Sequence, residues 1–133
     1  MEKLLRKEAE IKPDFEAADF EKRRHPRFAT ALPIEYGRIG SPENRSGHTS
    51  NISESGVMIS LPEQIEVGRN LRLKIFFSLG RELDNIEAAG RVVWTSTDME
   101  RKGYYRIGLK YEDISPENMQ RLRSLLDRFG DRW

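Results

Sequence analysis

Residues 51–61 of the chain are NISESGVMISL. In the second half of this stretch, Val57, Ile59 and Leu61 occupy every other position. Successive side chains of a β-strand point to opposite faces, so this spacing indicates a strand with one face in the core. Gly56 and the polar residues before it are typical of a turn. The stretch therefore predicts a polar turn that leads directly into a half-buried strand.

The same period-two pattern recurs on both sides of this stretch, separated by segments rich in Gly, Pro, Asn and Ser. Several short strands without crossover helices predict a mainly β fold. We expect a six-stranded antiparallel barrel, because closure leaves no exposed sheet edge. The alternating apolar sets are Leu32, Ile34 and Tyr36; Leu71, Leu73, Ile75 and Phe77; Ile86, Ala88, Val92 and Trp94; and Tyr105, Ile107, Leu109 and Tyr111.

The last segment changes from period two to helical spacing. Ser115 supplies a capping hydroxyl, and Pro116 suits the first helical position. Gly130 is typical of the residue that ends a helix. These signals predict an amphipathic C-terminal α-helix over about residues 116–129, with its apolar stripe packed on an open end of the barrel. The stripe consists of Met119, Leu122, Leu125, Leu126 and Phe129.

The N-terminal segment has a different character from the rest of the chain. Residues 1–21 are densely charged, and Pro13 interrupts the only short helical face. We expect residues 1–21 to form a charged N-terminal arm or short helix. Residues 22–133 are then a single barrel domain with its closing helix, because 133 residues suit one domain.

The composition excludes several classes of protein. The chain has no Cys and two His, which excludes thiolate sites and argues against a metal site. Lys plus Arg (23) nearly balances Asp plus Glu (22), which argues against a partner such as a long nucleic acid. No apolar run is long enough for membrane insertion, and the charged N-terminus does not resemble a secretory signal, so we expect a cytoplasmic protein.

Chemical motifs typical of enzymes are also missing from the sequence. It has no Ser/His/Asp grouping, no GxSxG elbow and no phosphate-binding glycine loop. Ser53 has no candidate base, so we do not interpret it as a nucleophile. We therefore expect no catalytic residues, no metal and no cofactor.

A basic cluster, RRHPR, covers residues 23–27 and includes the RxxxR pair Arg23 and Arg27. The planar arginine fork donates two parallel hydrogen bonds to a phosphate, and it matches the O6 and N7 acceptors of guanine. Pro26 favours an extended conformation at the preceding residue, which predicts a loop rather than a helix. Taken alone, the cluster is better explained as a solvated basic linker.

The turn at residues 51–56 has the pattern NxSxxG. Asn51 offers a donor and an acceptor, and Ser53 offers a hydroxyl that can do either. Gly56 permits a positive backbone angle and the close approach of a ligand. Taken alone, this pattern is also an ordinary polar turn.

The basic cluster precedes the NxSxxG turn, and Asn51 is 24 positions after Arg27. Together and in this order, the two motifs resemble those of the PilZ domain family. Further matches are GVMIS at residues 56–60, GRVVW at residues 90–94 and RIGLKY at residues 106–111. The resemblance covers about residues 22–113, and the final helix has a counterpart in many members of the family.

The resemblance implies a barrel that binds the bacterial second messenger cyclic di-GMP. In the family, the RxxxR loop wraps the dinucleotide and the [D/N]xSxxG turn contacts a guanine. A receptor of this kind changes conformation on binding and passes the signal to a protein partner, here unidentified, in motility, biofilm or exopolysaccharide control. The ligand-binding residues that match are Arg23, Arg27, Asn51, Ser53 and Gly56, with Arg24 as a third basic contact.

Two alternatives remain open from the sequence. A PilZ-like protein-interaction adaptor would keep the barrel and bind no nucleotide. A nonspecific single-strand nucleic-acid binder is another use of small barrels, but the near-zero net charge counts against it.

Other residues near the expected site have simpler explanations. Arg91 has the opposite parity from Val92, which predicts an exposed arginine on a strand. Trp94, Tyr105 and Tyr111 have core parity, which predicts packing rather than a base-stacking platform. Trp133 could cover the ligand or fray at the end of the chain.

Overall fold

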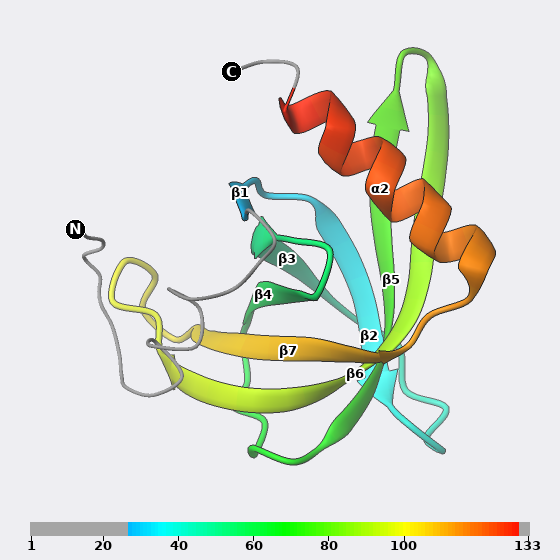
Figure 1. Ribbon diagram of the computed structural model, residues 1–133. Helices are drawn as coiled ribbons and strands as arrows, with labels where there is room; N and C mark the ends of the chain where they lie inside the picture. Colours follow the sequence, from blue (N-terminus) through cyan, green and yellow to red (C-terminus); the bar gives the residue numbers. More distant parts are fainter. Residues whose placement is uncertain (1–26, 131–133) are drawn as a thin grey trace.

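The computed structural model describes residues 27–130, which form seven strands and one helix (Figure 1). Residues 1–26 and 131–133 lie outside the described part, and so do the expected arm and Trp133. The elements are β1 (Phe28–Ala29), β2 (Pro33–Arg38), β3 (Arg45–Ile52), β4 (Gly56–Leu61), β5 (Asn70–Leu79), β6 (Glu82–Thr97), β7 (Tyr105–Asp113) and α2 (Pro116–Gly130).

The strands form one antiparallel sheet in the order β1-β3-β2-β5-β6-β7-β4. A further pairing of β3 with β4 closes this sheet into a six-stranded barrel, with the two-residue β1 outside it. The mainly β fold and the closed barrel predicted from the sequence are therefore confirmed. Closure removes the unpaired edges that an open sheet would expose.

The core follows the alternation of the sequence. Val57, Ile59 and Leu61 of β4 are at most 4% exposed, and the alternating apolar residues Leu71, Leu73, Ile75 and Phe77 of β5 are at most 5% exposed. Tyr105 and Tyr111 of β7 pack against this core, as their parity predicts. One barrel interior therefore supplies the hydrophobic stabilisation of the domain.

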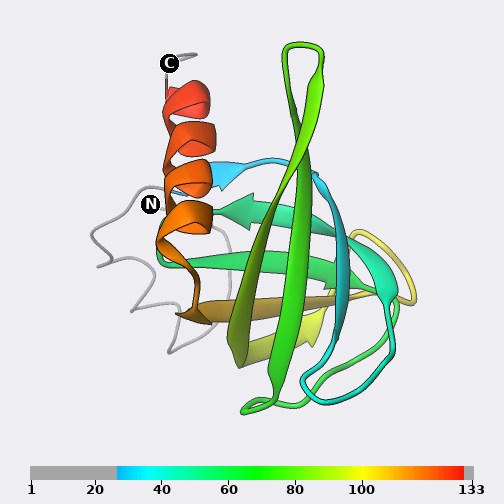
Figure 2. The same cartoon turned by 90° about the vertical axis from the view of Figure 1, so that its right-hand side faces the viewer.

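The β5–β6 hairpin extends well past the barrel and rises beside α2 (Figure 2). Its strands are paired from Asn70 and Arg91 to Leu79 and Glu82. Gly80 makes the tight turn with a positive φ of 66°, a conformation that favours glycine.

Helix α2 covers the end of the barrel at which the β3–β4 turn lies (Figures 1 and 2). Its start is as predicted, because the Ser115 hydroxyl accepts a hydrogen bond from the Asn118 amide at 3.1 Å. Leu122 is fully buried, and the Phe129 ring lies 5.8 Å from the Phe28 ring. The apolar stripe of the helix thus joins the barrel core.

The opposite end of the barrel carries a network of charges. Glu63 accepts a 2.6 Å hydrogen bond from the hydroxyl of buried Tyr36, and Arg38 and Arg45 both lie between Glu43 and Glu63. The backbone amide of Arg38 donates to Glu43, its guanidinium adds a second hydrogen bond, and together they hold the pKa of Glu43 below its usual value. Burial and the bond to Glu63 raise the pKa of Tyr36.

The lowered pKa of Glu43 predicts how stability depends on pH. A carboxylate whose pKa is lower in the folded state stabilises the fold above its unfolded pKa, and this contribution is lost as pH falls through the folded pKa. We expect Glu43→Gln to melt at a lower temperature than wild type at pH 7, with the gap closing below about pH 4. Thermal melts from pH 7 to pH 3 test this. The matched control Glu66→Gln, at an exposed side chain, should show no such convergence, and a constant gap for Glu43→Gln would contradict the account.

Candidate functional site

The turn at residues 51–56 connects β3 to β4 and is held together by Ser53. The Ser53 amide donates to the Gly56 carbonyl at 2.9 Å. The Ser53 hydroxyl, only 3% exposed, accepts from the amides of Ser55 and Gly56 at 3.3 and 3.2 Å. In this geometry, Ser53 fixes the shape of the turn from inside.

Gly56 is required for a reason different from the one expected. Its backbone angle is not among the positive φ values of the described residues. A Cβ added at Gly56 would instead collide with the carbonyl oxygen of Leu109 on β7. The expectation of a positive angle is therefore wrong, and the glycine allows β4 and β7 to approach closely.

β1 brings the end of the basic cluster to this turn. Phe28 pairs with Ile52 and Ala29 pairs with Asn51, in antiparallel register. The residue directly before β1 therefore lies beside the start of the turn. This residue is Arg27, which is half-buried. Arg23 and Arg24 lie outside the described residues, so of the RxxxR pair only Arg27 is seen.

The segment between β1 and β2 is fixed by a buried threonine. Thr49 is 2% exposed; its hydroxyl accepts a 2.8 Å hydrogen bond from the Leu32 amide and donates to the Thr30 carbonyl. The register of β3 against β4 shifts between Thr49 and Asn51. This bulge adds one residue before the turn, and bulges of this kind re-aim side chains next to binding sites.

A row of residues on the outside of the barrel runs through Asn51. Asn51 pairs with Met58, Met58 with Gly108, and Gly108 with Trp94, across β3, β4, β7 and β6. A Cβ added at Gly108 would collide with the Trp94 indole, so the indole lies over β7 at this glycine. Asn51 and Trp94 therefore share one outer surface.

The position of Trp94 corrects the expectation from the sequence. The register between β6 and β7 shifts between Val92 and Trp94, which makes Val93 an extra residue. Such a bulge inverts the parity of the positions after it. Val92 stays in the core, whereas half-buried Trp94 lies on the outer surface. The sequence did not predict this outward position of Trp94, because period two was continued through the bulge.

Positive charge lies in the adjacent row of the same surface. Gly56 pairs with Lys110, and Lys110 pairs with Arg91. Both basic residues are exposed, as predicted for Arg91, and the Arg91 guanidinium lies 3.2 Å from Glu112. The outer surface beside the turn therefore offers an amide, an indole and cationic groups together.

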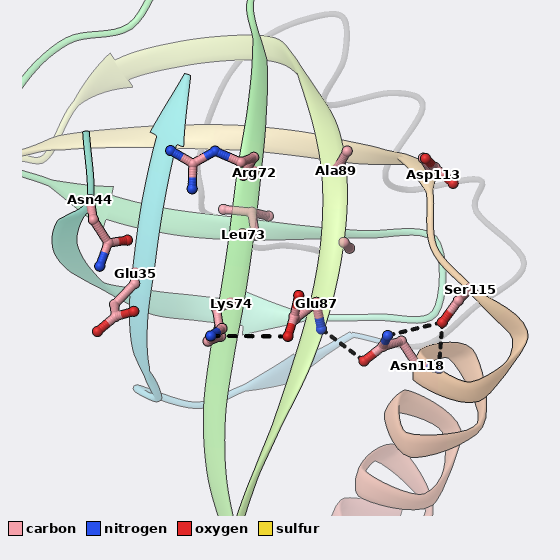
Figure 3. Close-up of a pocket in the computed structure, with 11 residues that line it drawn as sticks. Glu35, Asn44, Arg72, Leu73, Lys74, Glu87, Ala89, Asp113, Ser115 and Asn118 are labelled. Atoms are coloured by element: carbon pink, nitrogen blue, oxygen red, sulfur yellow. Dashed lines mark hydrogen bonds and ion pairs between the residues drawn. The ribbon is translucent and has the colours of Figure 1, made fainter. Parts of the chain in front are cut away.

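A groove of ≈490 Å³ lies elsewhere, over the outer face of β5 and β6 near the start of α2 (Figure 3). Lys74 and Glu87 face each other across it at 4.0 Å, and the Asn118 side chain accepts a hydrogen bond from the Glu87 amide. Of the described residues expected to bind ligand, namely Arg27, Asn51, Ser53 and Gly56, none lines this groove. We therefore place the candidate site at the turn rather than in this groove.

Comparison with known families gives one match: the PilZ domain, over residues 21–128. A comparison with curated proteins found no match. In residues 27–130 no helix is long and apolar enough to cross a membrane, and no group of three or more His, Asp or Glu side chains is arranged to hold a metal ion.

Several solved structures share the fold. The Bacillus subtilis inhibitor of motility MotI/DgrA has a TM-score of 0.70 and 22% identity, over 80% of this chain and 50% of that one. The PilZ domain of Escherichia coli YcgR with c-di-GMP has a TM-score of 0.63 and 11% identity, over 84% and 93%. Borreliella burgdorferi PlzA in complex with c-di-GMP has a TM-score of 0.53 and 17% identity, over 89% and 57%. This chain thus spans half the length of the motility inhibitor.

The close approach at Gly56 predicts the effect of adding a methyl group there. We expect Gly56→Ala to lower the free energy of unfolding by about 1–3 kcal/mol, because β4 and β7 must separate to admit it. Urea unfolding measures this. Ser55→Ala, an exposed position in the same turn, is the control and should change stability by less than about 0.5 kcal/mol. Equal stabilities of the two variants would show that the glycine is not a packing requirement.

Proposed function

The chain belongs to the PilZ domain family, and on that premise we propose that it is a receptor for cyclic di-GMP rather than an enzyme. The observation that carries the proposal is the pairing of β1 with the end of β3. This pairing brings half-buried Arg27 beside the NxSxxG turn, although Asn51 is 24 positions after Arg27 in the sequence.

The chemistry of the surface suits this ligand. Cyclic di-GMP carries two phosphates and two guanines. The Arg27 fork suits a phosphate or the O6 and N7 edge of guanine, and the Asn51 side chain makes no hydrogen bond to another described residue, which leaves it available to a base. Lys110 adds positive charge, and the Trp94 indole offers a face for stacking.

The remaining expected contacts have distinct roles in the proposal. Arg23 and Arg24 complete the basic loop around the ligand. Ser53 and Gly56 act mainly through the turn, because the Ser53 hydroxyl is engaged within it and Gly56 contacts β7. Ligand binding then changes how the N-terminal arm lies on the barrel, and this change passes the signal to a partner in the cytoplasm. The similar folds of the motility inhibitor MotI/DgrA and of YcgR and PlzA, whose structures contain c-di-GMP, support this class of function.

Calorimetric titration with cyclic di-GMP tests the proposal. We expect saturable binding by wild type and a ten- to hundred-fold or greater loss with Arg27→Ala, the value of a bidentate arginine contact (about 1–3 kcal/mol). GTP is the ligand control. Arg81→Ala, at an exposed arginine in the β5–β6 turn, is the matched variant and should bind as wild type does. Absence of heat and of thermal stabilisation at high ligand concentration would favour the adaptor that binds no nucleotide.

The outer-surface position of Trp94 gives a separate prediction. If its indole stacks on a guanine, Trp94→Ala should weaken binding of cyclic di-GMP about tenfold or more, since stacking contributes about 1–3 kcal/mol per base. Fluorescence or calorimetric titration measures the change. Met99→Ala, at a 91% exposed residue of the β6–β7 loop, is the control. Unchanged affinity in a folded Trp94→Ala variant would restrict the site to β1, β3 and β4.

A further inference from the structure

One residue of the turn carries a charge that opposes an anionic ligand. Glu54 lies between Ser53 and Ser55, within the NxSxxG sequence. A carboxylate in this position is close to the groups proposed to face two phosphates, and like charges at short range repel. The turn therefore needs an arrangement that removes the effect of Glu54.

Helix α2 supplies that arrangement through Arg123. The Nε and Nη2 atoms of Arg123 lie 3.0 and 2.9 Å from Oε1 of Glu54, so the guanidinium holds one carboxylate oxygen with both of these nitrogens. The Glu54 side chain is 28% exposed, and its ion pair with Arg123 joins it to α2. Contacts of this charge-assisted kind are shorter and stronger than neutral hydrogen bonds.

The position of Arg123 is fixed by the helix around it. Leu122 and Leu126 on either side are buried in the core, so the backbone that carries Arg123 is anchored to the barrel. Arg121, two residues earlier, instead lies 3.3 Å from Glu117 of its own helix and 3.9 Å from Asp84. Among the ion pairs seen within residues 27–130, the one made by Arg123 joins α2 to the turn.

We propose that Arg123 is a positioning residue for the ligand site. It holds Glu54 against α2 and offsets its charge, so that the turn presents the Asn51 amide to the ligand rather than a carboxylate. The inference rests on the proposed binding of cyclic di-GMP. It adds that the closing helix takes part in binding without contacting the ligand.

The binding test compares wild type, Arg123→Ala, the double variant Arg123→Ala/Glu54→Gln and the control Arg121→Ala in calorimetric titrations. We expect Arg123→Ala to bind cyclic di-GMP about tenfold more weakly at low salt, with a smaller loss at 0.5 M salt because salt screens the exposed carboxylate. The double variant should regain most of the affinity. An unaffected Arg123→Ala, or a double variant that stays as weak as the single one, would overturn the proposal.

A measurement without ligand separates this inference from the proposed function. The amides of Ser55 and Gly56 are hydrogen-bonded to Ser53, so their hydrogen exchange reports the order of the turn. We expect faster exchange of these two amides in Arg123→Ala and unchanged exchange in Arg121→Ala. Equal exchange in Arg123→Ala and wild type would overturn the positioning role. Wild type that fails to bind cyclic di-GMP would overturn the proposed function and the charge offset with it.

Discussion

Strand β3 is the constraint on which the rest of the structure depends, because it is hydrogen-bonded along both edges. One edge pairs with β2 and then with β1, and the other pairs with β4 to close the barrel. The same strand therefore closes the barrel around the core and pairs the segment after Arg27 with the start of the NxSxxG turn. Between β1 and β2, the Thr49 hydroxyl hydrogen-bonds to the Leu32 amide and the Thr30 carbonyl, so neither of these backbone groups is left unpaired. One strand thus positions both the barrel core and the candidate site.

The outer surface beside the turn depends on close backbone packing. Gly56 lies against the Leu109 carbonyl, and Gly108 leaves room for the Trp94 indole. Side chains at either glycine would separate the strands or displace the tryptophan. The candidate site lies on the outer surface across β3, β4, β7 and β6, whereas the groove is centred on Lys74 of β5, Glu87 of β6 and Asn118 of α2.

Most of the fold could be predicted from the sequence, because period-two alternation and helix capping are local signals. The β4 strand and the start of α2 at Ser115 follow from residues a few positions apart. Features that depend on tertiary contacts could not be predicted in this way. The bulge at Val93, which turns Trp94 outward, has no local signal, and the ion pair between Glu54 and Arg123 joins residues 69 positions apart. The motif pair predicts the candidate site residues, whereas the barrel determines which of the described ones face outward.

The central claim is that ligand binds where β1 meets the NxSxxG turn. The most direct measurement is a titration of ¹⁵N-labelled protein with cyclic di-GMP, followed by amide chemical shifts. The account predicts that the largest changes fall in residues 27–29 and 51–56, continue to Trp94 and Lys110, and leave Arg72 and Lys74 in the groove nearly unchanged. Changes centred on the groove, or no changes at saturating ligand, would contradict it.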